Sequence, residues 1–108
     1  MRLSVEGTLV VPMTVVVSDK AVKCKTIRLE DISTGQMFEA RANAKAGEYV
    51  VINELASRAT LIDGKGVEHQ VTYQMLHDTS ASNYRKLEEL DAELQAKLNA
   101  ESLESQSD

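Results

Sequence analysis

An apolar stripe in the last third of the sequence constrains the fold of this chain more than any other feature. Its members recur at steps of three or four residues, and they are Tyr84, Leu87, Leu90, Leu94 and Leu98. This spacing puts them on one face of an α-helix, with charged residues on the other faces. The segment Asp78-Thr79-Ser80 precedes the stripe and supplies side-chain oxygens that can cap a helix. We therefore predict a short helix after Val71, a bend at residues 78–80, and a long amphipathic helix of about five turns.

The first thirty residues instead favour β-strands. Branched and other apolar residues dominate residues 3–30, and the polar segment Ser18-Asp19-Lys20 divides them into two runs. This pattern predicts a β-hairpin with a turn at residues 18–20. Because Pro12 has no N–H to donate, its strand should bend there or lie at a sheet edge.

The middle of the chain favours two further helices. Ser33-Thr34-Gly35-Gln36 has the spacing of a capping box, in which a serine and the residue three positions later cap each other's N–H groups. A rival interpretation makes Ser33-Thr34-Gly35 a hairpin turn, but the alanine-rich segment that follows suits a helix better. Residues 48–62 repeat apolar side chains at helical spacing and predict a second helix, although its start is β-branched enough for a strand. Asp63-Gly64-Lys65-Gly66 predicts a turn.

These segments predict one α+β domain over residues 1–98. A small N-terminal β-hairpin or sheet occupies residues 3–31, and three to four helices follow over residues 34–98, the last of them long and amphipathic. Residues 99–108 are polar apart from one leucine and should form a disordered tail. Aromatic residues make up only 4% of the chain, so aliphatic side chains must build the core, which a partner protein can complete.

The charge distribution separates a neutral body from an acidic C-terminal part. Residues 1–77 hold nine acidic and nine basic residues, whereas residues 78–108 hold eight acidic and three basic ones. Nucleic acid is therefore a poor candidate for the ligand, because phosphate binding requires a basic face. The single cysteine, Cys24, cannot form an internal disulfide, and the apolar runs are too short to span a bilayer. We expect a cytoplasmic protein without a membrane or nucleic-acid partner.

No catalytic or metal-binding pattern is recognisable in the sequence. His69 and His77 are eight residues apart, on different faces of any helix, and are expected to face solvent. Cys24 lacks a nucleophile signature, and Asp63-Gly64-Lys65-Gly66 lacks the Walker spacing. The expected protein is therefore not an enzyme and binds neither a metal nor a cofactor.

The apolar stripe is the one candidate for a binding site, through Tyr84, Leu87, Leu90, Leu94 and Leu98. It either packs on the body of the domain or, beyond Leu90, runs past the body and offers a surface to a partner. If the stripe is only core, the valine-rich edge of the hairpin is the next candidate surface.

The order of these parts resembles the tail assembly chaperones of Mu-like phages and prophages. The matching pieces are the hairpin at residues 15–22, the strand at 27–31, the cap Ser33-Thr34-Gly35, the helix at 54–59, and a final unit of residues 75–78 with Tyr84 and Leu87. They span residues 10–98. The chain departs from that pattern at Gln36, where an acidic residue often follows the glycine, and it has no proline before Thr34.

The resemblance implies a chaperone that binds the hydrophobic tape-measure protein and keeps it soluble until the tail tube polymerises around it. In many phages a longer, frameshifted product also recruits tail-tube subunits, which makes the tube subunit a second potential partner. The alternative is a small structural tail or head-completion protein that is retained in the virion. A DNA-binding regulator is disfavoured by the charge distribution.

Overall fold

A long β-hairpin forms the N-terminal part of the protein. The computed structural model describes the backbone of residues 3–106 and the side chains of residues 3–101, and in it β1 (Ser4–Val17) pairs antiparallel with β2 (Lys20–Glu30). The turn residues Ser18 and Asp19 have φ angles of 50° and 64°. Two positive φ angles in a two-residue turn match the twist of the flanking strands. The predicted hairpin and its turn are confirmed.

The first strand is irregular around its proline. The register between β1 and β2 shifts between Thr8 and Met13, and Pro12 lies inside this interval. β1 is also an edge strand, because the strand order in the sheet is β1-β2-β3-β4. Pro12 thus lies where its missing N–H removes no ladder hydrogen bond, as the sequence predicts.

Two short strands that the sequence analysis missed complete the sheet. β3 (Ala59–Ile62) pairs antiparallel with residues 26–29 of β2, and β4 (Glu68–Gln70) pairs antiparallel with β3. The prediction of a helix from residue 48 to residue 62 is therefore wrong for its last four residues, because α2 (Val50–Arg58) ends at Arg58 and β3 follows. Ala59 and Leu61 are fully buried, and the strand lets them pack in the core while their backbone joins the sheet.

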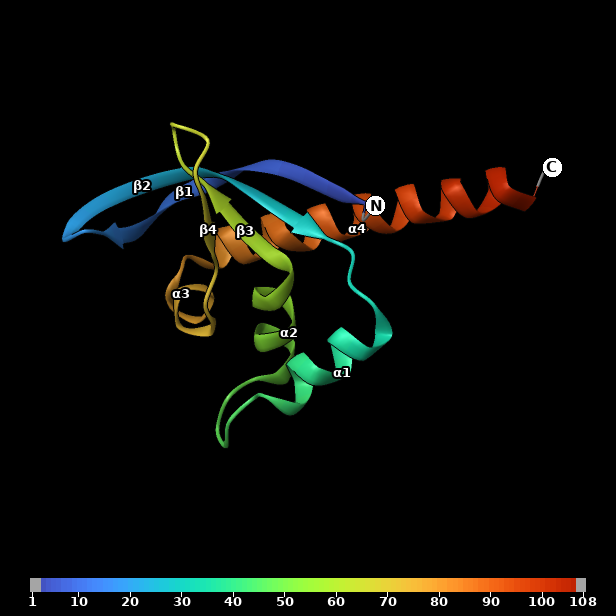
Figure 1. Ribbon diagram of the computed structural model, residues 1–108, viewed down its shortest axis with the longest axis horizontal. Coiled ribbons are helices and arrows are strands. Elements are labelled where there is room, and N and C mark those ends of the chain that lie inside the picture. The colour runs from blue at the N-terminus through green and yellow to red at the C-terminus, as the bar shows by residue number, and fades with distance from the viewer. Residues whose placement is uncertain (1–2, 107–108) are drawn as a thin grey trace.

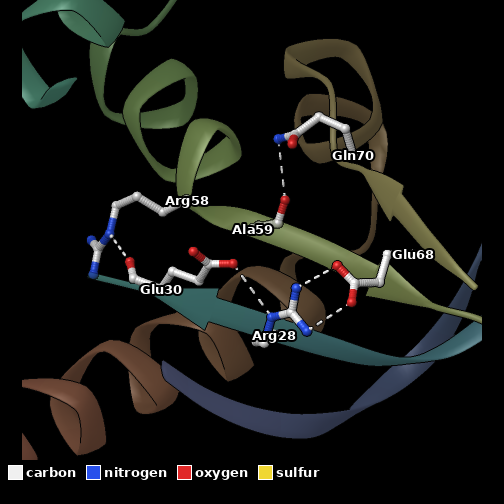
Figure 2. A network of polar contacts seen from close by, with 6 residues as sticks. All are labelled: Arg28, Glu30, Arg58, Ala59, Glu68 and Gln70. Atoms are coloured by element: carbon white, nitrogen blue, oxygen red, sulfur yellow. Dashed lines mark hydrogen bonds and ion pairs between the residues drawn. The ribbon is translucent and has the colours of Figure 1, made fainter. Parts of the chain in front are cut away.

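Polar side chains link β2 to β4 across β3, and β2 to the end of α2 (Figure 2). The guanidinium group of Arg28 contacts both carboxylate oxygens of Glu68 on β4, at 2.6 and 3.3 Å, and also pairs with Glu30 at 3.4 Å. Arg28 holds the pKa of the Glu68 carboxyl below its ordinary value. Arg58 donates from Nε to the backbone oxygen of Glu30 at 3.1 Å. The Arg58 contact holds the end of α2 against β2, and the Arg28 contacts hold β4 to β2.

The capping box forms and decides the structure of the alanine-rich segment. The hydroxyl of Ser33 accepts from the N–H of Gln36 at 3.2 Å, and the side-chain oxygen of Gln36 accepts from the N–H of Ser33 at 3.0 Å. α1 (Thr34–Ala42) follows. The helix is thus confirmed over the rival hairpin turn.

The chain ends in the predicted pair of helices, α3 (Tyr73–Asp78) and α4 (Ala81–Gln106). Ser80 caps the start of α4. Its hydroxyl accepts from the backbone N–H of Ser82 at 3.2 Å, and its backbone oxygen accepts from the N–H of Asn83 at 2.9 Å. α4 runs across one face of the sheet and its C-terminal turns project past the strands (Figure 1). The protein is therefore an α+β fold with a four-stranded antiparallel sheet and four helices, the last of them long.

Residues 99–106 differ from the expected disordered tail, because their backbone continues α4 as far as Gln106. Extending an existing helix needs no new nucleation, which favours this continuation. The described side chains of this segment, Asn99, Ala100 and Glu101, are exposed. Deleting residues 99–108 is therefore expected to change the free energy of unfolding by less than about 1 kcal/mol in urea denaturation. A larger loss would mean that Leu103, whose side chain lies outside the described part, packs on the body.

Candidate protein-binding surface

Most of the predicted binding stripe is part of the hydrophobic core. Leu87, Leu90 and Leu94 are at most 1% exposed, and Leu98 is partly buried against the same core. These side chains pack with residues of the sheet, among them Leu9, Ile27, Leu29 and Leu61. A partner protein cannot reach the three buried leucines without unfolding the domain.

Of the two alternatives for the stripe, the one in which it extends past the body of the domain beyond Leu90 is wrong for Leu94, which is buried. The reason is the length of β1, whose 14 residues extend the sheet along α4. Lys97 on α4 donates from Nζ to the backbone oxygen of Ser4 at 3.1 Å, so the start of β1 lies beside the second half of the helix. Gly7 permits this close approach, because a Cβ atom there would lie 2.8 Å from Cδ2 of Leu90.

Tyr84, the first residue of the stripe, packs partly against the same core and also lines an open groove on the helical side of the molecule. The groove has a volume of about 470 Å³. Three helices form it: α2 with its cap residue contributes Tyr49, Val51 and Ile52, α3 contributes Leu76 and His77, and α4 contributes Ala81 and Tyr84. Six of the eight lining residues thus carry an aliphatic or aromatic side chain other than histidine, which makes this a mainly apolar groove.

The exposed side chains at this groove are unusually large and apolar. Tyr49 is 64% exposed and Val51 is 62% exposed, and the adjacent Val50 is 43% exposed. This run of three residues at the start of α2 exposes apolar area that a partner can cover. The sequence signal for this surface was the apolar run at the start of α2, whose side chains extend beyond one helical face.

An aromatic stack stiffens one wall of the groove. The ring of His77 stacks with the rings of Tyr73 and Tyr49, at centroid distances of 5.7 and 6.4 Å. The hydroxyl of Tyr73 accepts from the backbone N–H of Tyr49 at 2.9 Å, which joins α3 to the start of α2. Gln74 and His77 both hydrogen-bond to Asp78 and hold the pKa of its carboxyl below the ordinary value. Asp78 therefore places a negative charge beside the groove wall that His77 forms.

A second exposed apolar surface lies on the hairpin. Val16 is 73% exposed and Val10 is 64% exposed, with Val11 and Val17 also exposed. This is the valine-rich hairpin edge that the sequence analysis named as the next candidate surface.

Three titratable side chains in or beside the sheet, Cys24, Asp63 and His69, are buried or paired. Cys24 is fully buried, and burial raises the pKa of its thiol, with a smaller contribution from Asp63. His69 does not face solvent as expected, because its side chain is only 14% exposed and its Nε2 lies 3.0 Å from Oδ2 of Asp63. That contact and the backbone N–H groups of Val67 and Lys65 lower the pKa of the Asp63 carboxyl.

The described residues contain neither a metal-ligand cluster nor a helix that could span a membrane. Among them, no group of three or more histidine, cysteine, aspartate or glutamate side chains is arranged to hold a metal ion. In the same part of the chain, no helix combines the length and the apolar character needed to cross a lipid bilayer.

Comparison with known proteins finds no match to this chain. No model of a protein family matches the chain, and neither a curated protein nor a solved structure matches it either.

Proposed function

We propose that the protein is a phage tail assembly chaperone, which binds apolar helical segments of a tape-measure protein in the groove between α2, α3 and α4. One observation carries the proposal: the groove is apolar, open, and flanked by the exposed side chains of Tyr49 and Val51. The resemblance of the chain to the tail assembly chaperones of Mu-like phages supplies the identity of the partner. The site of action is then the cytoplasm of the bacterial host.

The dimensions and chemistry of the groove suit a helix. An amphipathic helix binds by placing the apolar side chains of one face into a groove between other helices. A volume of about 470 Å³ accommodates several aliphatic side chains. Covering the apolar stripe of a long helical partner removes the surface through which such a chain aggregates. The eight acidic residues between positions 78 and 108 give the complex a net charge that favours solubility.

Co-expression with the tape-measure protein of the same phage or prophage tests the proposal. Val51→Asp places a charge at the groove and is expected to leave the tape-measure protein largely in the pellet, whereas the wild-type chain keeps it in the supernatant. Val16→Asp is the matched control, because it makes the same change at a similarly exposed valine of the hairpin. Circular dichroism of each purified variant verifies that both fold.

Equal solubilisation by wild type and by a folded Val51→Asp variant would rule out this groove as the binding site. Failure of the wild-type chain itself would contradict the chaperone function. Stoichiometric amounts of the protein in purified virions would instead support the small structural tail or head-completion component.

A further inference from the structure

The hairpin has a stretch of strand edge with which no other strand of the described chain pairs. β2 pairs with β1 on one side from Lys20 to Glu30, but on its other side β3 covers only the residues from Thr26 to Leu29. Within residues 3–106, the outer edge of β2 at residues 20–25 thus has no strand beside it. Figure 1 shows this part of the hairpin projecting past β3 and β4 as a two-stranded ribbon.

The turn geometry determines which backbone groups this edge presents. In a two-residue hairpin turn, the flanking residues, here Val17 and Lys20, hydrogen-bond to each other. Because the bonding direction alternates along a strand, Val22 also bonds towards β1. The N–H and C=O groups of Ala21 and Lys23 therefore point outward, where a further strand can bond to them.

A groove of about 520 Å³ lies along the inner face of this ribbon, between the hairpin and the turn from β3 to β4. Its apolar wall includes Val17, Val22 and Val67, and Val67 is 51% exposed. Lys20 and Lys65 also line the groove. A strand added to the edge would place every second side chain against these valines.

The charge of the edge determines which occupant fits. Lys23 and Lys25 are exposed on the edge, and Lys20 and Lys65 line the groove below it. In an antiparallel pairing of two copies of this edge centred on Lys23, Lys23 of one copy would face Lys23 of the other, and like charges opposite each other destabilise a strand pair. The same lysines instead attract a strand that carries acidic side chains. The carboxylate of Asp63, which accepts from the N–H groups of Lys65 and Val67 and contacts the ring of His69, also lines this groove, but the four lysines outnumber it.

We propose that residues 20–25 of β2 form a strand-addition site for an extended segment of another protein in which apolar and acidic residues alternate. The apolar side chains contact the valines of the groove, and the acidic ones pair with the lysines of the edge. Ala21 and Lys23 supply the backbone hydrogen bonds. The site is separate from the groove between α2, α3 and α4 and does not depend on the function proposed for it.

Amide hydrogen exchange of the ¹⁵N-labelled protein tests the site with a peptide of alternating valine and glutamate. The peptide is expected to slow exchange at the amides of Ala21 and Lys23, while a peptide of alternating valine and lysine does not. Lys23→Pro removes one outward N–H without removing a bond to β1, and it is expected to weaken binding of the glutamate peptide about tenfold. Lys23→Gln keeps the N–H but removes the charge. At low salt it should weaken binding less than Lys23→Pro does, and at high salt it should not weaken binding.

Three results would overturn the proposal. The first is unchanged exchange at Ala21 and Lys23 in the wild-type protein at saturating glutamate peptide, a measurement that needs no variant to fold. The second is equal protection by the valine–lysine peptide. The third is protection of the same two amides in the absence of any peptide, together with dimers in analytical ultracentrifugation, which would assign the edge to a second copy.

Discussion

Replacing Leu94 by alanine is expected to lower the free energy of unfolding by about 3 kcal/mol, as much as the same change at Leu87. Both side chains are completely buried, although Leu94 lies about two helical turns further along α4. The truncation removes apolar contacts with the sheet and leaves a cavity that a rigid sheet cannot fill. Urea denaturation followed by circular dichroism measures the loss, and Leu98→Ala, at a partly buried position, is the control with a smaller effect.

The same reasoning excludes Leu94 as a probe of partner binding. Leu94→Asp would bury a charge without a partner and is expected to unfold the protein. Loss of tape-measure solubility in that variant would report on folding alone. A Leu94→Ala variant with wild-type stability would show that the helix leaves the body before residue 94, and it would restore the stripe as a candidate surface.

Asn83→Ala is expected to cost about 2–4 kcal/mol, an unusually large effect for a polar residue. Asn83 is fully buried and contacts the irregular part of β1. Its Oδ1 accepts from the N–H of Val11 at 3.0 Å, and its Nδ2 donates to the backbone oxygen of Val11 at 2.7 Å and to the hydroxyl of Thr79 at 2.9 Å. Val11 lies where the register between β1 and β2 shifts, so its backbone groups depend on this side chain.

Asn83→Asp is the matched control, because it preserves the shape and the acceptor but not the donor. When ionised, the new carboxylate faces the backbone oxygen of Val11, so the variant should be clearly destabilised at neutral pH. Burial raises the pKa of such a carboxyl in the folded state. Protonation at acidic pH restores a donor, so the loss relative to wild type at the same pH should shrink as the pH falls. Wild-type stability of Asn83→Ala would contradict the role of this side chain in holding β1 against α4.

The groove and the strand edge can be tested independently. Val51→Asp changes the surface formed by α2, α3 and α4, and Lys23→Pro changes the edge of β2. Each variant leaves the other surface intact, so a partner that requires both would be lost in either variant. A partner that is lost in only one of them is assigned to a single surface.

The local sequence pattern predicted the structure correctly wherever neighbouring residues decide the conformation. The turn at Ser18 and Asp19, the cap made by Ser33 and Gln36, and the start of α4 at Ser80 each depend on hydrogen bonds or φ angles within a few residues. The period of three and four in the leucine stripe likewise predicted which face of α4 is apolar. The α+β class follows from these elements.

The helical prediction for residues 59–62 failed because those residues are also compatible with a strand, and only their partners decide between the two. Leu61 pairs with Ile27 and His69, which lie 34 residues before it and eight residues after it in the sequence. Burial of Leu61 in the hydrophobic core then outweighs the local helix preference. No pattern within residues 48–62 contains this information.

The sequence by itself determined whether most elements are helices or strands and which of their faces is apolar. Only the tertiary structure decided what covers each apolar face. Helical periodicity shows that Leu94 and Tyr84 share a face. Leu94 is buried because the start of β1, which is distant in the sequence, lies beside this part of α4, as the contact between Lys97 and Ser4 shows. Tyr84 lines an open groove because α2 and α3 meet α4 there without covering it. A side chain's burial depends on such non-local contacts, and these are set by strand length and packing rather than by the spacing of apolar residues.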